Sequence, residues 1–248
     1  MIQLEGVSKR LGTKQVLEDL FLELPTGLTT VILGRSGSGK SVLLKHIIGL
    51  MHPDEGRIVV DGEDIAHLDE AELNRVRRRF GMLFQGAALF DSLTVGENIA
   101  LPMREHLRIG DDEIHRRVAE RLSWVGLQGV EDMKPASLSG GMKKRVGLAR
   151  AVAIDPTHIL YDEPTTGLDP IMSDVINNLI RSIQQRMNVT SVVVTHDLHS
   201  AWKVGDRVAL LHEGRVQFTG TPAEAEVSND MLVRQFIEGR SEGPVAPV

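Results

Sequence analysis

Eight consecutive residues early in the chain constrain its fold more than any other part of the sequence. They read Gly34-Arg35-Ser36-Gly37-Ser38-Gly39-Lys40-Ser41 and match the pattern G-x-x-x-x-G-K-[S/T] at every defined position. An apolar run at 29–33 precedes them, and a helix-prone stretch follows. This order predicts a phosphate-binding loop, the P-loop, because backbone N–H groups and a helix N-terminus both attract phosphate oxygens.

A second segment has the character of a nucleotide site. The apolar residues 159–161 are followed directly by Asp162 and Glu163. Two acids at a strand end are often only solvated, but a complete P-loop upstream favours ATP and Mg²⁺ as ligands. Lys40 would then reach the β- and γ-phosphates, and Ser41 and Asp162 would hold Mg²⁺. Glu163 would polarise the attacking water.

The composition is that of a globular protein, with 42% hydrophobic and 25% charged residues. The 248 residues suffice for one large α/β domain with an insertion. A net charge of −6 argues against a nucleic-acid partner, and the absence of cysteine excludes disulfides and thiolate sites. Because no apolar run reaches the ~18–20 residues of a bilayer span and no signal-like core opens the chain, we expect a cytoplasmic protein.

Hydrophobic patterning predicts an α/β core interrupted, over residues 86–137, by a stretch without strands. The expected strands lie at 2–7, 21–24, 29–33, 57–60, 158–161, 190–195, 208–211 and 216–219. Two helices are expected to bury one stripe each: Ile114, Val118, Leu122 and Val125; and Val175, Leu179, Ile183 and Met187. A turn is expected at Glu213-Gly214, and a capping box at Asp69 and Glu72.

Another glycine-containing segment precedes a helix-prone stretch at 143–153. It reads Leu138-Ser139-Gly140-Gly141-Met142, and small residues before a helix form an anion-binding corner. Gln85, Asp169 in Gly-Leu-Asp and His196 in Val-Thr-His-Asp occur in a matching order. Over essentially its whole length the chain resembles the ATP-binding-cassette (ABC) ATPases, whose signature motif, Q-loop, D-loop and switch histidine these residues match.

The resemblance implies a mechanism shared by two copies of the chain. Two subunits of this family enclose two ATP molecules head to tail, with the P-loop of one facing Ser139–Gly141 and Asp169 of the other. Gln85 would contact ATP and Mg²⁺ and relay movement to a membrane partner. His196 would contact the γ-phosphate and share the catalytic role with Glu163.

The resemblance also implies the fold class: an α/β P-loop NTPase of ABC type, with a mixed sheet core, an antiparallel β subdomain and a helical insertion. One domain is expected over 1–240. Residues 1–85 and 138–240 would form the core and the β subdomain, and 86–137 the helical subdomain. Residues 241–248 would be a loose tail.

One position departs from the family pattern. Most ABC ATPases stack adenine on an aromatic residue early in the chain, and Leu11 occupies that place here. Leucine keeps apolar contact with the base but loses ring stacking, so base discrimination and nucleotide affinity are expected to differ.

Finer features resemble the ATPases of Mce-type lipid transporters, of which the maintenance-of-lipid-asymmetry (Mla) system is the best known. They are the runs 84–95 and 101–106, Met142 where most ABC proteins have Gln, and the ending 234–240. This resemblance implies phospholipid transport between the inner and outer membranes. It also implies three partners: an integral-membrane permease, a periplasmic Mce-domain protein and, in some systems, a small cytoplasmic regulatory subunit. The chain would lie at the cytoplasmic face of the inner membrane, held by the permease.

Several alternatives stay open at this stage. The same ATPase could drive another cargo, such as an amino acid, since cargo contacts lie in other chains. A non-transport ABC protein is disfavoured by the single copy of each motif. Phe90 could anchor the permease or be buried in the helical subdomain. The arginines at 75 and 77–79 could bind anionic lipid or a regulator, or form a solvated helix face.

Overall fold

The computed structural model describes residues 1–244, and the tail expected over 241–248 lies partly outside these described residues. The chain divides into two compact units. The first is formed by residues 1–67 and the C-terminal segment from Val194, and the second by Leu68–Val193. Strand β8 (Thr190–Thr195) runs from the second unit into the first.

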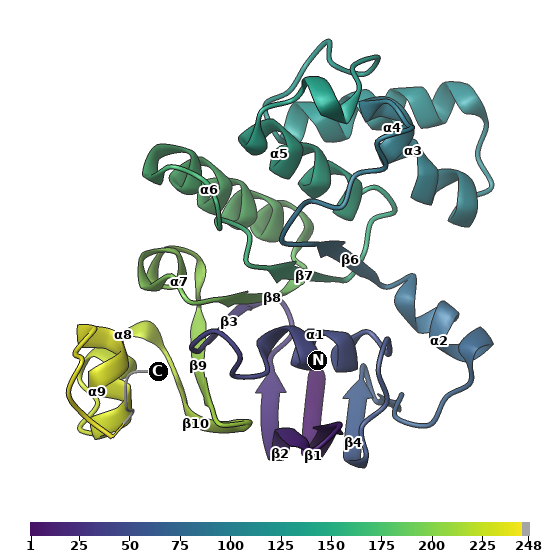
Figure 1. The fold of residues 1–248 in the computed structure, drawn as a ribbon. Helices are drawn as coiled ribbons and strands as arrows, with labels where there is room; N and C mark the ends of the chain where they lie inside the picture. Colours follow the sequence, from purple (N-terminus) through teal and green to yellow (C-terminus); the bar gives the residue numbers. More distant parts are fainter. Residues whose placement is uncertain (245–248) are drawn as a thin grey trace. The chain divides into compact units, whose positions relative to one another are not determined.

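The first unit contains most of the strands (Figure 1). Its N-terminal elements are β1 (Ile2–Leu11), β2 (Lys14–Leu24), β3 (Thr29–Leu33), α1 (Lys40–Ile47), β4 (Glu55–Val60) and β5 (Glu63–Asp64). Its C-terminal elements are α7 (Leu198–Val204), β9 (Arg207–His212), β10 (Arg215–Gly220), α8 (Pro222–Glu226) and α9 (Met231–Glu238).

The second unit is mostly helical. Its elements are α2 (Glu70–Arg77), β6 (Phe80–Leu83), α3 (Val95–His106), α4 (Asp111–Trp124), a 3₁₀ turn (Pro135–Ser137), α5 (Gly140–Ala151), β7 (His158–Asp162) and α6 (Pro170–Met187). Within the described chain, residues 86–137 contain no strand, as predicted. None of the helices over residues 1–244 has the length and apolar character needed to cross a bilayer.

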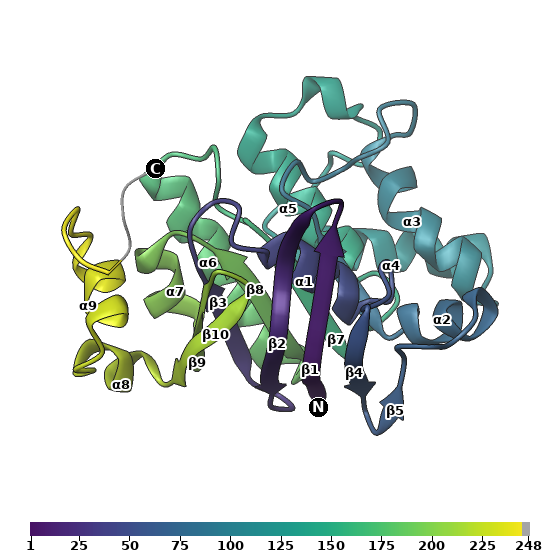
Figure 2. The same ribbon diagram turned by 60° about the horizontal axis from the view of Figure 1, so that its bottom comes forward.

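An antiparallel sheet in the first unit has the order β2-β1-β4-β5, with its strands side by side in Figure 2. Alternation along β2 buries Leu20, Leu22 and Leu24, whereas Phe21 between them is 60% exposed. Both β1 and β2 extend several residues beyond the predicted strands, because their distal ends lack the alternation on which the prediction depended.

A second sheet positions the P-loop. Strand β3 pairs in parallel with β9, and β9 pairs antiparallel with β10, so the sheet is mixed, as predicted. All five residues of β3 are buried, which is typical of a strand covered on both faces. The β9–β10 turn has φ of 47° at Glu213 and 74° at Gly214, the two positive angles that a tight hairpin turn requires.

In the second unit, β6 and β7 pair in parallel, and α3, α4 and α5 pack on one another (Figure 1). The predicted stripe of α4 is confirmed, since Ile114, Val118, Leu122 and Val125 are all buried. The capping box of α2 is also confirmed, with Asp69 and Glu72 each accepting a hydrogen bond from the other's backbone N–H.

The predicted buried face of α6 is wrong by about one residue. The buried residues are Ile176, Asn177, Ile180, Ile183 and Gln184. Val175, Leu179 and Met187 are only half-buried. The prediction failed because two amide side chains, Asn177 and Gln184, lie in the buried stripe, and hydropathy assigns such residues to the solvent side.

Helix α1 contains a buried histidine, His46, from which we expect a pH-dependent stability of the first unit. His46 is 0% exposed, and its Nδ1 donates to the Val42 carbonyl at 2.8 Å. Burial, aided by the nearby Lys9, lowers the pKa of His46 below its usual 6.5. Below that pH the unfolded chain therefore binds a proton that the folded chain excludes.

We predict that the melting temperature falls as pH decreases from 7.5 to 5.5, and that His46→Leu removes part of this fall. A contribution of about 1 kcal/mol corresponds to a shift of about 2–4 °C in a chain of this size. Thermal melts over this pH range measure it. The control is His199→Leu at an exposed position, which should keep the wild-type pH dependence. An identical dependence in both variants would contradict the assignment.

Candidate functional site

The predicted site residues are divided between the two units. Leu11, the P-loop and His196 lie in the first, and Gln85, the signature motif, Asp162, Glu163 and Asp169 lie in the second. The residues of each set are therefore described within their own unit. The joint roles that cross this division, such as Mg²⁺ binding by Ser41 with Asp162, stay predictions.

The P-loop connects β3 to the N-terminus of α1, as predicted. Gly39 has φ of 105°, and a Cβ there would lie 2.9 Å from the Val16 carbonyl oxygen, so a side chain at this position would be strained and crowded. No side chain caps the start of α1, and its first turn contains no acidic residue. The positive potential of this helix N-terminus is therefore not neutralised locally, which favours a phosphate ligand.

Lys40 lies inside the loop. Its side chain is buried, and Nζ donates to the carbonyl oxygens of Gly34 at 2.6 Å and Arg35 at 3.0 Å. The ammonium is thus held at the centre of the turn that would surround a phosphate. Against the loop lies a hollow of about 450 Å³, lined by residues 36–38 and by the start of β2 at residues 14–16.

Leu11 and His196 are both accessible. Leu11 ends β1 with 41% of its surface exposed, which suits an apolar contact with a base. His196 follows β8 and is exposed in the turn before α7. That turn is ordered by its neighbours, because Thr195 Oγ1 accepts from the Asp197 N–H at 3.0 Å and Asp197 caps α7.

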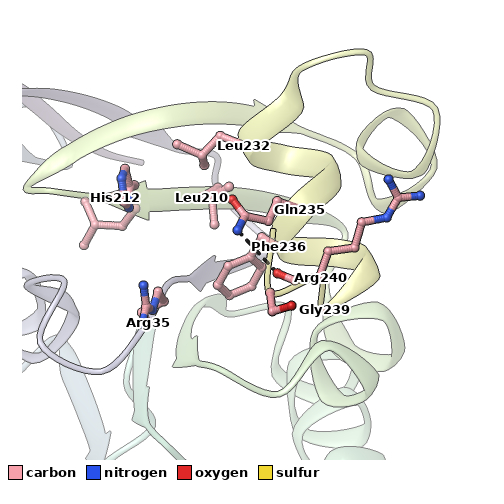
Figure 3. Close-up of a pocket in the computed structure, with 10 residues that line it drawn as sticks. Arg35, Leu210, His212, Leu232, Gln235, Phe236, Gly239 and Arg240 are labelled. Carbon is pink, nitrogen blue, oxygen red and sulfur yellow. Dashed lines mark hydrogen bonds between the residues drawn. The ribbon is translucent and has the colours of Figure 1, made fainter. Parts of the chain in front are cut away.

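Arg35 has a divided role. Its carbonyl binds Lys40, but its side chain lines a separate pocket of about 320 Å³ beside α9 (Figure 3). Leu232 and Phe236 of α9 form one wall of this pocket, and Leu210 of β9 lies opposite. Arg35 also lines the hollow against the P-loop, so this residue borders both cavities.

The two acids that follow the apolar run are at the end of β7, as predicted. Glu163 has φ of 47°, a left-handed conformation that costs a non-glycine residue on the order of 1–2 kcal/mol. Its carboxylate is held by Thr166, whose Oγ1 donates to Oε2 at 3.0 Å. Its carbonyl accepts from Lys144 Nζ at 3.2 Å. Both the carbonyl and the carboxylate of this strained residue are thus held by neighbouring groups.

The Q-loop has an unusual backbone. Ala87 and Ala88, the second and third residues after Gln85, have φ of 62° and 46°. Arg150 of α5 donates to both of their carbonyl oxygens, each at 2.7 Å, and Lys144 of the same helix donates to the Gln85 carbonyl at 2.5 Å. The side chain of Gln85 is exposed, so its amide is available to a ligand.

The signature motif starts helix α5. Ser139 caps the helix by accepting from the Met142 N–H at 3.2 Å, and the first turn contains no acidic residue. This is the second helix N-terminus suited to an anion. Within the same copy the D-loop lies beside it, since a Cβ at Gly140 would be 3.8 Å from Leu168. Asp169 Oδ1 accepts from the Met172 N–H at 3.0 Å and caps α6, so this carboxylate has a structural role in addition to the predicted one.

The residues implied for Mg²⁺ have suitable chemistry. Ser41, Gln85 and Asp162 all offer oxygen, the donor that Mg²⁺ prefers. In the part of the chain that the structure describes, no three acidic or histidine side chains cluster as a metal cage.

A surface groove of about 850 Å³ lies beside the Q-loop. Its apolar lining includes Phe84 and Phe90, which are 38% and 53% exposed, with Leu101 and Pro102 of α3. The interpretation of Phe90 as buried core is therefore wrong. Ala87, by contrast, is buried.

A fully buried asparagine shapes this groove. Asn98 accepts from the Phe90 N–H at 2.8 Å and donates to the carbonyls of Phe90 at 3.1 Å and Thr94 at 2.9 Å. These bonds hold the segment 90–94 in one conformation and leave the Phe90 ring outside.

Sequence reasoning missed Lys144, Arg150, Asn98 and Thr166. Only Lys144 gave a signal, because its charge interrupts the buried stripe of α5 formed with Gly141, Leu148 and Ala151. The others bond to backbone carbonyls or to a side chain whose position no local pattern reveals.

Comparison with known proteins agrees with this geometry. The family model for "ABC transporter" matches residues 17–166. A "probable ribonucleotide transport ATP-binding protein mkl" of Mycobacterium leprae is 42% identical over 98% of this chain and 70% of its own. An "intermembrane phospholipid transport system ATP-binding protein MlaF" of Haemophilus influenzae is 40% identical over 99% of this chain and 93% of its own.

Solved structures show the same fold. A dimeric, post-hydrolysis ATP-binding cassette bound to ADP and Pi matches with a TM-score of 0.83 at 35% identity, covering 89% of this chain and 98% of the other. This confirms the expected ABC-type fold class. From its motifs, its fold and its relatives, the chain belongs to the ABC transporter family.

Proposed function

We propose that the chain is the ATPase subunit of an ABC transporter that moves phospholipid between the inner and outer membranes through a partner permease. The observation that supports phospholipid as the cargo is the 40% identity to a protein named for intermembrane phospholipid transport, over nearly the full length of both chains. The ATPase activity has independent support from the P-loop, the acids of β7 and the signature helix described above.

In the proposed reaction, ATP is held by its phosphates and Leu11 contacts the base. Lys40 exchanges its bonds to loop carbonyls for bonds to the β- and γ-phosphates. Glu163, placed by its left-handed backbone and by Thr166, accepts a proton from the attacking water. His196 contacts the γ-phosphate. Ser41, Asp162 and Gln85 hold Mg²⁺, which neutralises charge on the phosphates when bound.

The second half of each site comes from a second copy. The N-terminus of α5, with Ser139–Gly141, and Asp169 would face the ATP of the partner. The dimeric cassette with ADP and Pi supports this arrangement, because its fold matches over most of the chain. A single domain over 1–240, with 86–137 as its helical subdomain, is part of the same proposal.

The groove beside the Q-loop is the proposed docking site of the permease. Aromatic residues such as Phe84 and Phe90 concentrate binding energy at interfaces when they enter a partner's pocket. Docking there would hold the chain at the cytoplasmic face of the inner membrane. A periplasmic Mce-domain protein would act through the permease, and a small regulatory subunit could bind the ATPase.

Partners are also required by the cargo itself. Moving roughly thirty lipid methylenes through water would cost on the order of 20 kcal/mol at about 0.8 kcal/mol each. The proposed ATPase supplies motion, and the apolar path belongs to the other chains.

The relative named for ribonucleotide transport favours a second candidate, the same ATPase driving a polar cargo. The two are separated by purifying the transporter through this chain and reconstituting it in vesicles. ATP-dependent transfer of a fluorescent phospholipid supports the first. ATP-dependent uptake of a labelled ribonucleotide, without lipid transfer, would overturn it.

Two substitutions test the nucleotide chemistry as a pair. Lys40→Ala should weaken ATP binding by about 10²-fold or more, because it removes the charge facing the phosphates. Glu163→Gln should bind ATP normally but hydrolyse it about 10²–10⁴ times more slowly, since it loses the general base. Equilibrium binding and steady-state hydrolysis distinguish them. Tight binding by the Lys40 variant would contradict the assignment.

Sharing of the site between copies predicts complementation. Lys40→Ala and Gly140→Asp subunits should each be inactive, and a mixed dimer should regain one intact site and about half of the wild-type ATPase rate per dimer. The rates are measured in transporters purified through two different tags. Inactive heterodimers would show instead that each copy needs its own signature motif.

Phe90→Ala should weaken permease binding by about 2 kcal/mol, which is about 30-fold, if the ring is an anchor. Because Phe90 is exposed, the melting temperature of the isolated subunit should stay within a few degrees of the wild type. Phe21→Ala is the matched control, a similarly exposed ring on β2. Equal pull-down of both variants would remove Phe90 from the interface.

A further inference from the structure

Lys144 connects two functional segments of the second unit through one ammonium group. It lies in α5, three residues after the last glycine of the signature motif, and is only 5% exposed. Its Nζ donates to the Gln85 carbonyl at 2.5 Å and to the Glu163 carbonyl at 3.2 Å. A single side chain thereby ties the Q-loop to the end of β7.

The bond from Lys144 is one of those that hold Glu163 in its left-handed conformation. A left-handed backbone at a non-glycine residue persists only where its surroundings hold it. At Glu163, the carbonyl accepts from Lys144 Nζ at 3.2 Å and from the Thr166 N–H at 3.3 Å, and the carboxylate accepts from Thr166 Oγ1. Loss of the Lys144 bond would leave this carbonyl with the longer bond from the Thr166 N–H, and a rotation of the weakened backbone would turn the carboxylate away from its present direction.

The other end of the connection is held equally firmly. Arg150 binds the carbonyls of Ala87 and Ala88, so the Q-loop cannot move without disturbing α5. Gly147 lets the helix approach, because a Cβ there would lie 2.7 Å from Leu83 and 3.3 Å from Ala87. Among these contacts, Lys144 also reaches Glu163.

A charged ammonium form of Lys144 suits a side chain that donates to two carbonyl oxygens. Burial lowers its pKa, and the carboxylates of Asp162 and Glu163 act in the opposite direction and favour the ammonium form. An ammonium has three donors and no acceptor, which suits a group that must bind two carbonyl oxygens at once.

We propose that Lys144 is a positioning residue that couples the Q-loop to Glu163, so that movement of the Q-loop changes the placement of the hydrolytic carboxylate. The inference rests on the function proposed above, in which Glu163 activates water and the groove beside the Q-loop receives the permease. Lys144 itself touches neither ATP nor the attacking water in this scheme.

The test compares three full-length variants with the wild type. Lys144→Met keeps the length of the side chain but removes both bonds. Lys144→Gln keeps two N–H donors. Lys143→Met is the control, the same substitution one residue earlier at a half-buried position of the same helix. Steady-state ATPase assays give kcat and KM, and thermal melts report the fold.

Lys144→Met should lower kcat at least tenfold while the KM for ATP stays within about threefold, because binding does not depend on Glu163. Lys144→Gln should recover part of kcat, and Lys143→Met should behave as wild type. In a Glu163→Gln background, Lys144→Met should cause no further loss, since both changes affect the same step. In the assembled transporter, the stimulation of Lys144→Met by the permease should approach a factor of one.

Four results would overturn the inference. The first is an unchanged kcat in Lys144→Met, and the second is a loss of kcat/KM that comes entirely from a higher KM, together with a lower melting temperature. The third is a full further loss of kcat in the Glu163→Gln background. The fourth is undiminished stimulation of Lys144→Met by the permease. With an active wild type, any of these rejects the coupling alone. A wild-type transporter that hydrolyses no ATP would reject the proposed function as well.

Discussion

The close contact of α5 with the end of β6 and the segment that follows it is the constraint on which the second unit depends. Leu83 and Ala87 approach the helix at Gly147, where a side chain would collide with them. This approach places Arg150 beside the carbonyls of Ala87 and Ala88, the two residues with left-handed backbones. It also places Lys144 between the Q-loop and the end of β7. The helix that presents the signature motif at its N-terminus therefore also fixes the segments that a permease and an attacking water would use.

The first unit depends on a different device, a helix N-terminus left without acidic neighbours. Helix α1 begins without a capping side chain, whereas α2, α3 and α8 begin with capping boxes and acids in their first turn. A capping side chain satisfies one of the free N–H groups of the first turn. The first turn of α1 therefore has neither a capping side chain nor an acidic residue, which favours an anion there.

Features encoded by neighbouring residues were predictable from the sequence. The P-loop, the Asp69 capping box, the Glu213-Gly214 turn and the stripe of α4 each depend on a few adjacent positions. Features that depend on distant residues were not. The left-handed Glu163 is held by a lysine 19 positions away, and the strained alanines by an arginine more than 60 positions away. The buried face of α6 was misplaced because buried amides do not register as apolar.

The bonds made by Asn98 have a consequence for how such an ATPase could acquire a new partner. A loop already ordered by an internal side chain loses little conformational entropy when a second protein binds it. Little of the binding free energy is then needed to order the loop. Because of the same bonds, residues 90–98 form one structural unit that would have to be exchanged as a whole. Transplanting this loop onto another ATPase would require moving Asn98 with it, because the loop would otherwise lose its internal support.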